Sequence, residues 1–159
     1  MSAVDPQHAL LELLNTTPVI EGRATESLDG SWLRMHGGAG QRVDDARRLR
    51  DDLQRVVRGE APAKILDVHL RGVTQIPSIV DGVVTWHLDA GWAARMVLAW
   101  GQLESASPGR LRPCANDECR LFLIDRSRGG TGRWCSMSGC GNRMKARRHY
   151  DRTAGRPGD

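Results

Sequence analysis

All four cysteines of this 159-residue chain lie between positions 114 and 140. They form two pairs, Cys114 with Cys119 and Cys135 with Cys140, with four residues inside each pair and fifteen between the pairs. Thiolates are preferred zinc ligands, and a structural zinc site is tetrahedral with four protein ligands. The spacing therefore predicts one structural Zn²⁺ bound by the four thiolates, with a redox-active dithiol as the rival chemistry. Because four thiolates fill the coordination sphere, a catalytic zinc is not expected.

The start of the chain bears on the state of these thiols. The segment MSAVDPQHALLELLN has no basic leader followed by a long apolar run. No segment of the chain reaches the roughly 18 to 20 consecutive apolar residues of a membrane span. We therefore expect a cytoplasmic protein without membrane contact, in which reduced thiols bind metal instead of forming disulfides.

The residues between and after the cysteines predict the elements that position them. Residues 121–125 are typical of a strand, 126–132 of a glycine-rich turn and 133–135 of a return strand, and Ser138 is the expected N-cap of a helix that continues past Cys140. This order of ligand pair, hairpin, ligand pair and helix is typical of treble-clef or ribbon-like zinc folds. The segment has few large apolar residues, so zinc binding, worth about 10–16 kcal/mol in finger peptides, must stabilise it.

Charge is unevenly distributed along the chain. The net charge is +4, but from residue 110 onward twelve Arg and Lys oppose five Asp and Glu, which gives +7 there and leaves −3 for the first 109 residues. A basic segment of this kind attracts polyanions. For Asn142 and Arg143, which adjoin a ligand, bracing of the zinc loops is the alternative role. The predicted nucleic-acid contacts are Arg126, Arg128, Arg133, Asn142, Arg143, Lys145, Arg147 and Arg148.

The first 108 residues predict a mostly helical domain with one β-hairpin, so the chain as a whole is expected to be α+β. The hairpin is placed at 73–88, around the turn-forming Asp81-Gly82 pair. Residues 105–113, SASPGRLRP, are typical of a linker, which divides the chain into domains 1–108 and 109–155. Helices are predicted from Asp5 to Asn15, from an N-cap at Thr25 to Gly37, from Val43 to Arg58, from Pro62 to Gly72 and from Gly91 to Ser105.

The first domain shows no pattern that demands catalysis. It contains no glycine-rich phosphate loop, no serine nucleophile elbow and no HExxH, and its histidines are scattered. We therefore expect no enzyme activity. A small-molecule effector pocket in this domain is the alternative to a plain packed core, with Asn15, Arg23 and Trp32 as its candidate residues.

The run from Arg110 to Arg152 resembles the CGNR zinc finger, which is named for the tetrapeptide at 140–143. Both cysteine pairs, the Asp-Arg-Ser turn at 125–127 and the Trp-Cys-Ser-Met run at 134–137 match that family. The sequence departs from it at Gly132, where an additional arginine is common.

The first domain is similar, more loosely, to the ABATE domain that precedes this finger in bacterial proteins. The similarity lies in Leu13-Leu14-Asn15-Thr16 and in the segment 28–33, with Glu12 where an aspartate is usual. These resemblances imply a bacterial, stress-linked transcription regulator, in which the finger binds DNA on the nucleoid and the N-terminal domain senses an effector or assembles, for example as a homodimer. An RNA-binding zinc protein and a zinc-stabilised module for an acidic protein partner are the alternatives.

Overall fold

A computed structural model describes residues 5–154. Residues 1–4 at the start of the first predicted domain, which also begin the segment MSAVDPQHALLELLN, and residue 155 at the end of the second predicted domain lie outside this range. The elements are α1 (Pro6–Leu14), β1 (Val19–Ile20), β2 (Arg23–Ala24), α2 (Gly30–Met35), α3 (Val43–Val57), the 3₁₀-helix η1 (Ala63–Leu70), β3 (Thr74–Val80), β4 (Val83–Asp89), α4 (Trp92–Ala106), β5 (Leu111–Pro113), β6 (Phe122–Ile124), the π-helical turn η2 (Met137–Gly141) and α5 (Asn142–Ala154). Helices mixed with small two-stranded sheets confirm the α+β expectation.

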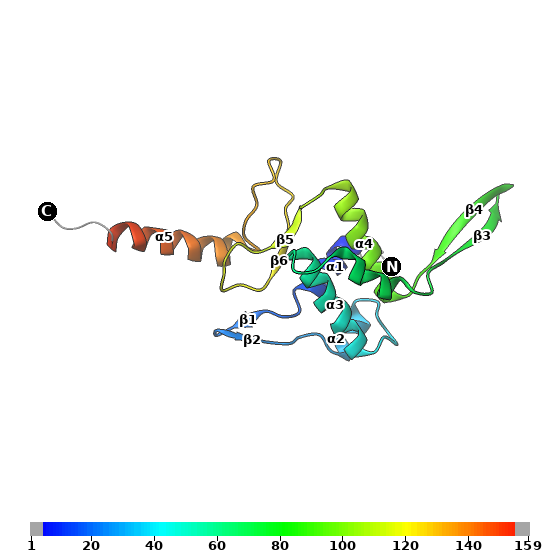
Figure 1. Cartoon of the computed structure of the whole chain (residues 1–159), viewed down its shortest axis with the longest axis horizontal. Helices are drawn as coiled ribbons and strands as arrows, with labels where there is room; N and C mark the ends of the chain where they lie inside the picture. The colour runs from blue at the N-terminus through cyan, green and yellow to red at the C-terminus, as the bar shows by residue number, and fades with distance from the viewer. Residues whose placement is uncertain (1–4, 155–159) are drawn as a thin grey trace.

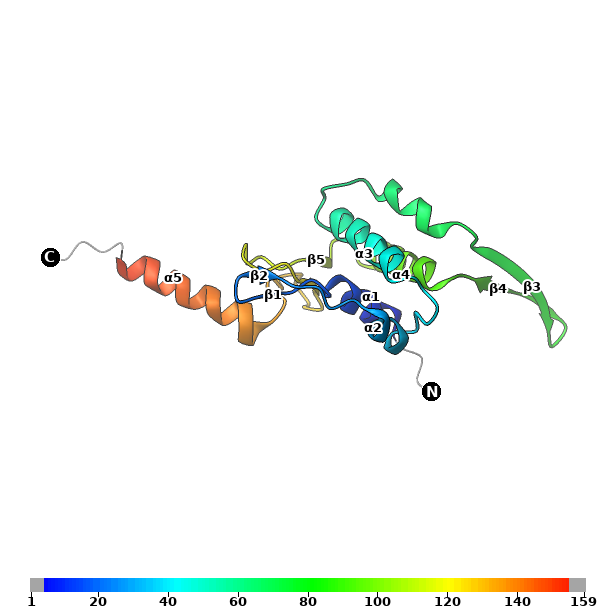
Figure 2. The same cartoon turned by 90° about the horizontal axis from the view of Figure 1, so that it is seen from below.

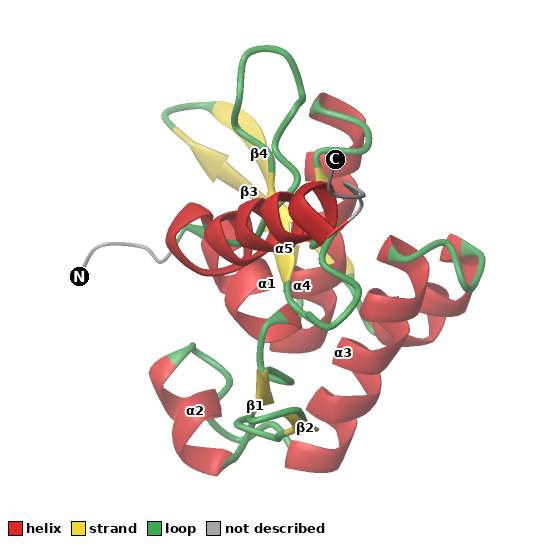
Figure 3. Cartoon of the chain, turned by 90° about the vertical axis from the view of Figure 1, so that its left-hand side faces the viewer, coloured by secondary structure: helices red, strands yellow, loops and turns green. Residues whose placement is uncertain are grey.

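Helices α1, α3 and α4 form the body of the molecule (Figures 2 and 3). The predicted periodicity of α3 is confirmed, because Leu49 and Leu53 are fully buried against Leu10 and Leu13 of α1. A fully buried leucine contributes about 1.5–3 kcal/mol relative to an exposed one. The stripe of apolar residues on α3 therefore fixes how this helix lies in the body.

A buried polar network ties the loop after α1 to α3. The Arg50 guanidinium, which is 4% exposed, donates to the Thr16 hydroxyl at 3.1 Å and to the Glu26 carboxylate at 2.7 Å. The Thr16 hydroxyl in turn donates to the Leu13 carbonyl oxygen at 2.8 Å. The buried charge is thus paired and hydrogen-bonded, as burial of a guanidinium requires.

The predicted helix starts are right for α1 and wrong for α2. Asp5 caps α1, and its carboxylate accepts from the Gln7 N–H at 3.0 Å. The cap of α2 is Asp29, whose carboxylate accepts from the Trp32 N–H at 2.7 Å. Thr25, the predicted cap, instead donates its hydroxyl to the Pro18 carbonyl oxygen and closes the short β1–β2 hairpin, which the sequence did not predict.

The β3–β4 hairpin is confirmed. Its strands pair antiparallel over seven residues each, and Asp81 and Gly82 form the turn with φ of 50° and 77°. Both values are in the left-handed region that a two-residue hairpin turn requires. The hairpin projects from the body on the side opposite α5 (Figure 1).

Strands β5 and β6 differ from prediction. Residues 111–113, expected in the linker, form β5 and pair with β6, whereas residues 133–135 form no strand. Leu111 and Phe122, which are 3% and 1% exposed, belong to the same hydrophobic core as α1, α3 and α4. The predicted division of the chain at residue 108 stays a prediction.

No helix within residues 5–154 combines the length and the apolar composition that a membrane crossing requires.

Candidate metal centre

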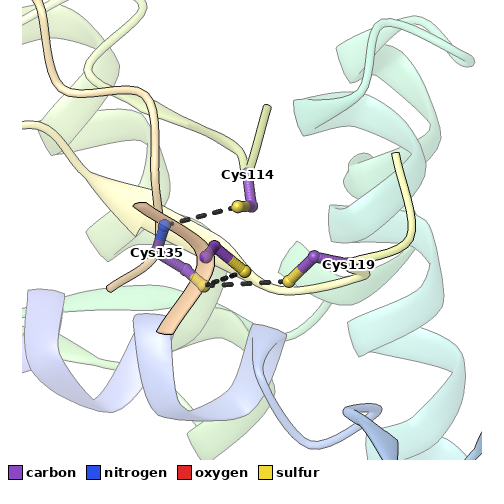
Figure 4. Close-up of side chains that lie close together, drawn as sticks. Cys114, Cys119 and Cys135 are labelled. Atoms are coloured by element: carbon purple, nitrogen blue, oxygen red, sulfur yellow. Dashed lines mark hydrogen bonds between the residues drawn. The ribbon is translucent and has the colours of Figure 1, made fainter. Parts of the chain in front are cut away.

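The four cysteine sulfurs converge on one point. All four Sγ atoms lie within 4.8 Å of one another. The Cys135 Sγ lies 3.7 Å from the Sγ of Cys119 and 3.7 Å from that of Cys140. Figure 4 shows the side chains of Cys114, Cys119 and Cys135 around the same point. In a tetrahedral site with Zn–S bonds of 2.3 Å, neighbouring sulfurs are separated by about 3.8 Å. The donor set and its spacing therefore fit one structural zinc ion.

The end of β5 and the π-helical turn η2 position one ligand of each pair. Cys114 directly follows β5, and its N–H continues the β5–β6 ladder by donating to the Leu121 carbonyl oxygen at 2.8 Å. Cys140 lies in η2, whose N-cap is Ser136; the Ser136 hydroxyl accepts from the Gly139 N–H at 3.1 Å. The predicted cap, Ser138, is therefore wrong by two positions.

Hydrogen bonds to sulfur distinguish the four thiols. The Cys135 N–H donates to the Cys114 Sγ, and the Asn116 side-chain amide donates to the Cys140 Sγ, both at 3.4 Å. Although burial opposes ionisation, the Asn116 amide and the neighbouring cysteines hold the pKa of Cys140 below its ordinary value. Burial raises the pKa of Cys119 to about 11 and also raises the pKa of Cys135. Because zinc binds thiolates, metal binding at this site releases protons.

Asn116 is a site residue that the sequence interpretation missed. Its side chain is 1% exposed, and besides donating to Cys140 it accepts from the Glu118 N–H at 3.2 Å. It thereby shapes the loop between Cys114 and Cys119 and also stabilises a ligand from the other pair. The available signal was an amide side chain inside the first CxxxxC loop.

The tetrapeptide at 140–143 combines packing with exposure. Gly141 is buried, and a Cβ there would lie 3.1 Å from the Met137 Sδ and 3.3 Å from the Trp134 Cδ1, so this contact favours glycine. Asn142 is exposed and donates to the Ser138 carbonyl oxygen at 3.3 Å. Arg143 lines an open groove of about 880 Å³ between the β1–β2 hairpin and the zinc loops.

Asp125 organises the arginine-rich loop. Its carboxylate accepts from the backbone N–H groups of Ser127 and Gly132, each at 2.9 Å, and from the Arg112 guanidinium. Hydrogen bonds from the Ser127 side chain and from these N–H groups, together with the positive charge of Arg112, lower the pKa of Asp125 to about 2, against the cost of burial. Gly132 belongs to this arrangement, because a Cβ there would lie 2.6 Å from the Asp125 Oδ1. The departure from the family at Gly132 therefore has a local structural basis.

The predicted nucleic-acid contacts fall into separate groups. All the side chains of α5 from 142 to 153 are exposed except that of Met144, which is half-buried. The guanidinium carbons of Arg133 and Arg148 lie 5.2 Å and 6.0 Å from the Trp134 ring centroid, so this indole brings the two arginines together. Arg147 lies on another side of α5 and approaches the Glu118 carboxylate at 3.8 Å.

Arg126 and Arg128 lie elsewhere. Both line a shallow hollow with Gln7 of α1 and Ser107, which follows α4. Arg126 also approaches the Asp5 carboxylate at 4.0 Å. The loop carries these arginines toward the body, and contact between any of the eight residues and nucleic acid stays a prediction.

The three candidate residues for an effector pocket lie on separate elements. The Asn15 side-chain amide makes two hydrogen bonds to the backbone of Phe122: its NH₂ group donates to the Phe122 carbonyl oxygen at 3.2 Å, and its oxygen accepts from the Phe122 N–H at 2.7 Å. Trp32 stacks on His36 with ring centroids 3.8 Å apart, and Arg23 is exposed on β2. Asn15 and Trp32 thus serve packing, and an effector site stays a prediction.

Comparison with known proteins assigns the C-terminal part of the chain. Residues 110–153 match the CGNR zinc finger family, and this range contains the four cysteines, Asn116, Asp125 and most of α5. No curated protein matches the chain. The similarity of the first domain to ABATE stays a prediction. Residues 110–153 of the chain therefore match the CGNR zinc finger, and the four clustered cysteines within them could bind one structural zinc ion.

Proposed function

We propose that this chain is a DNA-binding transcription regulator of the bacterial cytoplasm, in which zinc maintains the finger and α5 contacts duplex DNA on the nucleoid. The observation that carries the proposal is α5 itself. This helix has no buried side chain between 142 and 153, and over its length it carries five Arg or Lys residues against one acid, Asp151. An exposed helix of this charge suits a polyanion.

The geometry of α5 supports a duplex as the polyanion. The helix begins directly after the ligand Cys140 and extends away from the body (Figures 1 and 2). Its thirteen residues span about 20 Å. The major groove of B-DNA, about 12 Å wide, admits a helix of this kind without rearrangement of the body.

One side of α5 is the better candidate for the duplex. Lys145, Arg148 and Arg152 recur at three- and four-residue intervals and line one hollow together with Asp151. Arg147 lies on another side of the helix, where it approaches the Glu118 carboxylate. We therefore assign the phosphate contacts first to the side that carries Lys145, Arg148 and Arg152, which extends the predicted set by Arg152.

The rest of the proposal follows from the sequence expectations. The N-terminal helical body senses an effector or assembles the protein. The proposal contains no catalytic step, because a zinc ion with four thiolates has no open coordination position.

The test measures duplex affinity of the full zinc-loaded chain across a salt series. Each phosphate contact contributes about 0.9 to the slope of log K against log salt. We expect the double variant Lys145→Ala/Arg152→Ala to bind more weakly and to lower the slope by up to about 1.8. The matched control is Arg42→Ala/Arg48→Ala, which removes the same charge from the N-cap of α3 and from α3 itself, where the two side chains are 79% and 72% exposed. The slope for this control should equal that of the wild type.

Equal slopes for the two double variants would overturn the assignment to α5. A structured RNA that competes at lower concentration than the duplex would replace DNA with RNA as the ligand. Binding of neither nucleic acid above nonspecific levels would favour an acidic protein partner. Zinc content and the far-UV circular dichroism of each variant show whether the finger is intact.

A further inference from the structure

We propose that the β3–β4 hairpin, referred to below as the arm, is a self-association surface through which two copies of this chain pack face to face. The arm leaves the body as an isolated pair of strands (Figure 1). Two-stranded hairpins are marginally stable in water and need a further layer against their apolar face. The composition of the two faces of the arm indicates what that layer is.

One face of the arm is almost entirely apolar. Side chains alternate between the two faces along each strand, and side chains that pair across the strands share a face. The register therefore puts alternate residues of β3, from 75 to 79, on this face together with alternate residues of β4, from 84 to 88. Four of them are strongly exposed: Ile79 at 75%, Val84 at 58%, Trp86 at 62% and Leu88 at 52%. Pro77, opposite Trp86, and Gln75, opposite Leu88, complete this face, and Gln75 is its one polar side chain.

The opposite face is mixed and carries a polar network. The Ser78 Oγ lies 2.9 Å from the Thr85 Oγ1 and 2.6 Å from the His87 Nε2. Ile76, Val80 and Val83 share this face and are 51%, 48% and 62% exposed. The Ser78, Thr85 and His87 side chains interrupt these apolar residues with polar groups that suit water, so the continuous apolar face is the one that a partner is expected to cover.

The charges on the arm favour a second copy over an anionic partner. No Lys or Arg occurs between Arg71 and Arg95, whereas Asp81 and Asp89 lie within this segment. Nucleic acids and anionic membranes are recognised through cations. A two-fold interface brings a surface against itself, so an uncharged apolar face meets its own copy without repulsion.

The area is sufficient for such an interface. The exposed parts of the four strongly exposed side chains amount to about 500 Å² in each copy, so two faces would bury about 1,000 Å², the lower bound for a specific interface. Trp86, the largest of these side chains, lies in the middle of β4, where a central aromatic anchor is expected. Packing two arms gives a four-stranded sandwich with layers about 10 Å apart.

The charges also favour an orientation. If the arms pointed the same way, the two Asp81 carboxylates at the turns would lie close together. With the arms antiparallel, each Asp81 lies near the base of the other arm. Asp89 ends β4 there, but the exposed Arg71, which precedes β3, offsets the Asp89 charge, whereas arms that point the same way bring Asp81 against Asp81 with no cation nearby. We therefore place the turn of each arm at the base of the other.

The test compares two adjacent valines of β4 that lie on opposite faces of the arm. Val84 is 58% exposed on the apolar face, and Val83 is 62% exposed on the mixed face. Sedimentation velocity of the full zinc-loaded chain over a concentration series should show a wild-type dimer. We expect Val84→Asp to weaken the dimer at least about tenfold, because a carboxylate is then buried without a partner. Val83→Asp should leave it unchanged.

Other variants and outcomes keep the proposal open to refutation. Trp86→Ser should act like Val84→Asp, and retained zinc and helical circular dichroism will show that the body is folded in each variant. Asp81→Asn should weaken an antiparallel dimer, whereas strengthening would overturn that orientation. A wild-type monomer at about 200 μM, or equal effects of the two valine variants, would overturn the proposal. So would a monomer that binds neutral or anionic vesicles and loses this binding in Val84→Asp.

Discussion

At the scale of single residues, the cysteine cluster is supported by side chains that supply no sulfur ligand themselves. Asn116 is the clearest case, because its buried amide donates to the Cys140 sulfur from within the loop of the other cysteine pair. A side chain in this position orients the ligand and stabilises its charge.

We predict that Asn116→Ala raises the zinc dissociation constant by about 10- to 100-fold, because the Cys140 thiolate loses a donor and the 114–119 loop loses its turn. Competition with a chromophoric chelator at fixed pH measures the change. Asn142→Ala is the matched control, since the Asn142 side chain is exposed and, among the described residues, hydrogen-bonds only the Ser138 carbonyl oxygen. Equal losses in both variants would show that Asn116 has no particular role at the sulfur.

Asp125 gives the molecule a predictable response to acid. Its pKa in the folded protein is about 2, below the ordinary 3.8, so the ionised form stabilises the fold. This contribution is complete above about pH 5 and is lost as the pH falls through the window between about 4 and 2.

We therefore predict that Asp125→Asn destabilises the protein at pH 7, and that the gap in urea midpoint between wild type and variant narrows as the pH falls through this window. The difference is the quantity to measure, because acid releases zinc from both proteins. A gap that stays constant from pH 7 to pH 2 would mean that the Asp125 charge contributes nothing to stability.

Residue type and spacing were enough to predict the ligands, because a structural zinc site selects four thiolates irrespective of their surroundings. They were not enough for Asn116 or Asp125. Asp125 accepts from Gly132, seven residues on, and Asn116 donates to Cys140, 24 residues on. Such roles depend on which backbone group or sulfur a fold brings near, and a local pattern does not record this.

At the scale of elements, the zinc loops and the helical body rest on different forces. Leu49 and Leu53 of α3 are buried against α1 without any contribution from metal. The loops around Cys119 and Cys135 have little apolar burial of their own, and both cysteines are only half-buried. Zinc must therefore supply most of their order.

We predict that removal of zinc by a chelator, or the substitution Cys135→Ser, abolishes amide protection at 114–121 and 133–141 while α1, α3 and α4 keep theirs. Hydrogen exchange read by mass spectrometry on the full chain distinguishes these segments. Uniform loss of protection in the body as well would show that the metal stabilises the entire molecule.

Elements specified by neighbouring residues were predictable from the sequence. The stripe of α3 and the Asp81-Gly82 turn are local signals, and both elements form as expected. The cap of α2 was misplaced because Thr25 and Asp29 are both good caps, and the Thr25 hydroxyl instead bonds Pro18 across a hairpin. The β5–β6 pairing was missed because prolines and a glycine made residues 105–113 typical of a linker, although 111–113 form a short strand whose partner lies about ten residues away.

At the scale of the whole molecule, the arm and α5 leave the body on opposite sides (Figure 1). The two proposals therefore use separate surfaces: an uncharged apolar face for a second copy and a basic helix for DNA. The sequence predicted both elements but not their placement, because the direction in which each leaves the body depends on packing between distant segments. Variants at Val84 and at Lys145 should accordingly affect assembly and duplex affinity independently.

The contact between Asn15 and Phe122 also bears on how such chains can be recombined. Phe122 lies within the matched finger, yet its ring is buried in the helical core. Asn15 hydrogen-bonds its backbone, and the Arg58 Cζ lies 4.5 Å from the centroid of its ring. A finger cut out before Leu111 would carry two core side chains into water and leave a hole of the same shape behind. This finger is therefore not expected to fold as an independent domain. If it were fused to a foreign protein, that protein would need a helix that ends in an asparagine and an apolar cavity that accepts the Phe122 ring.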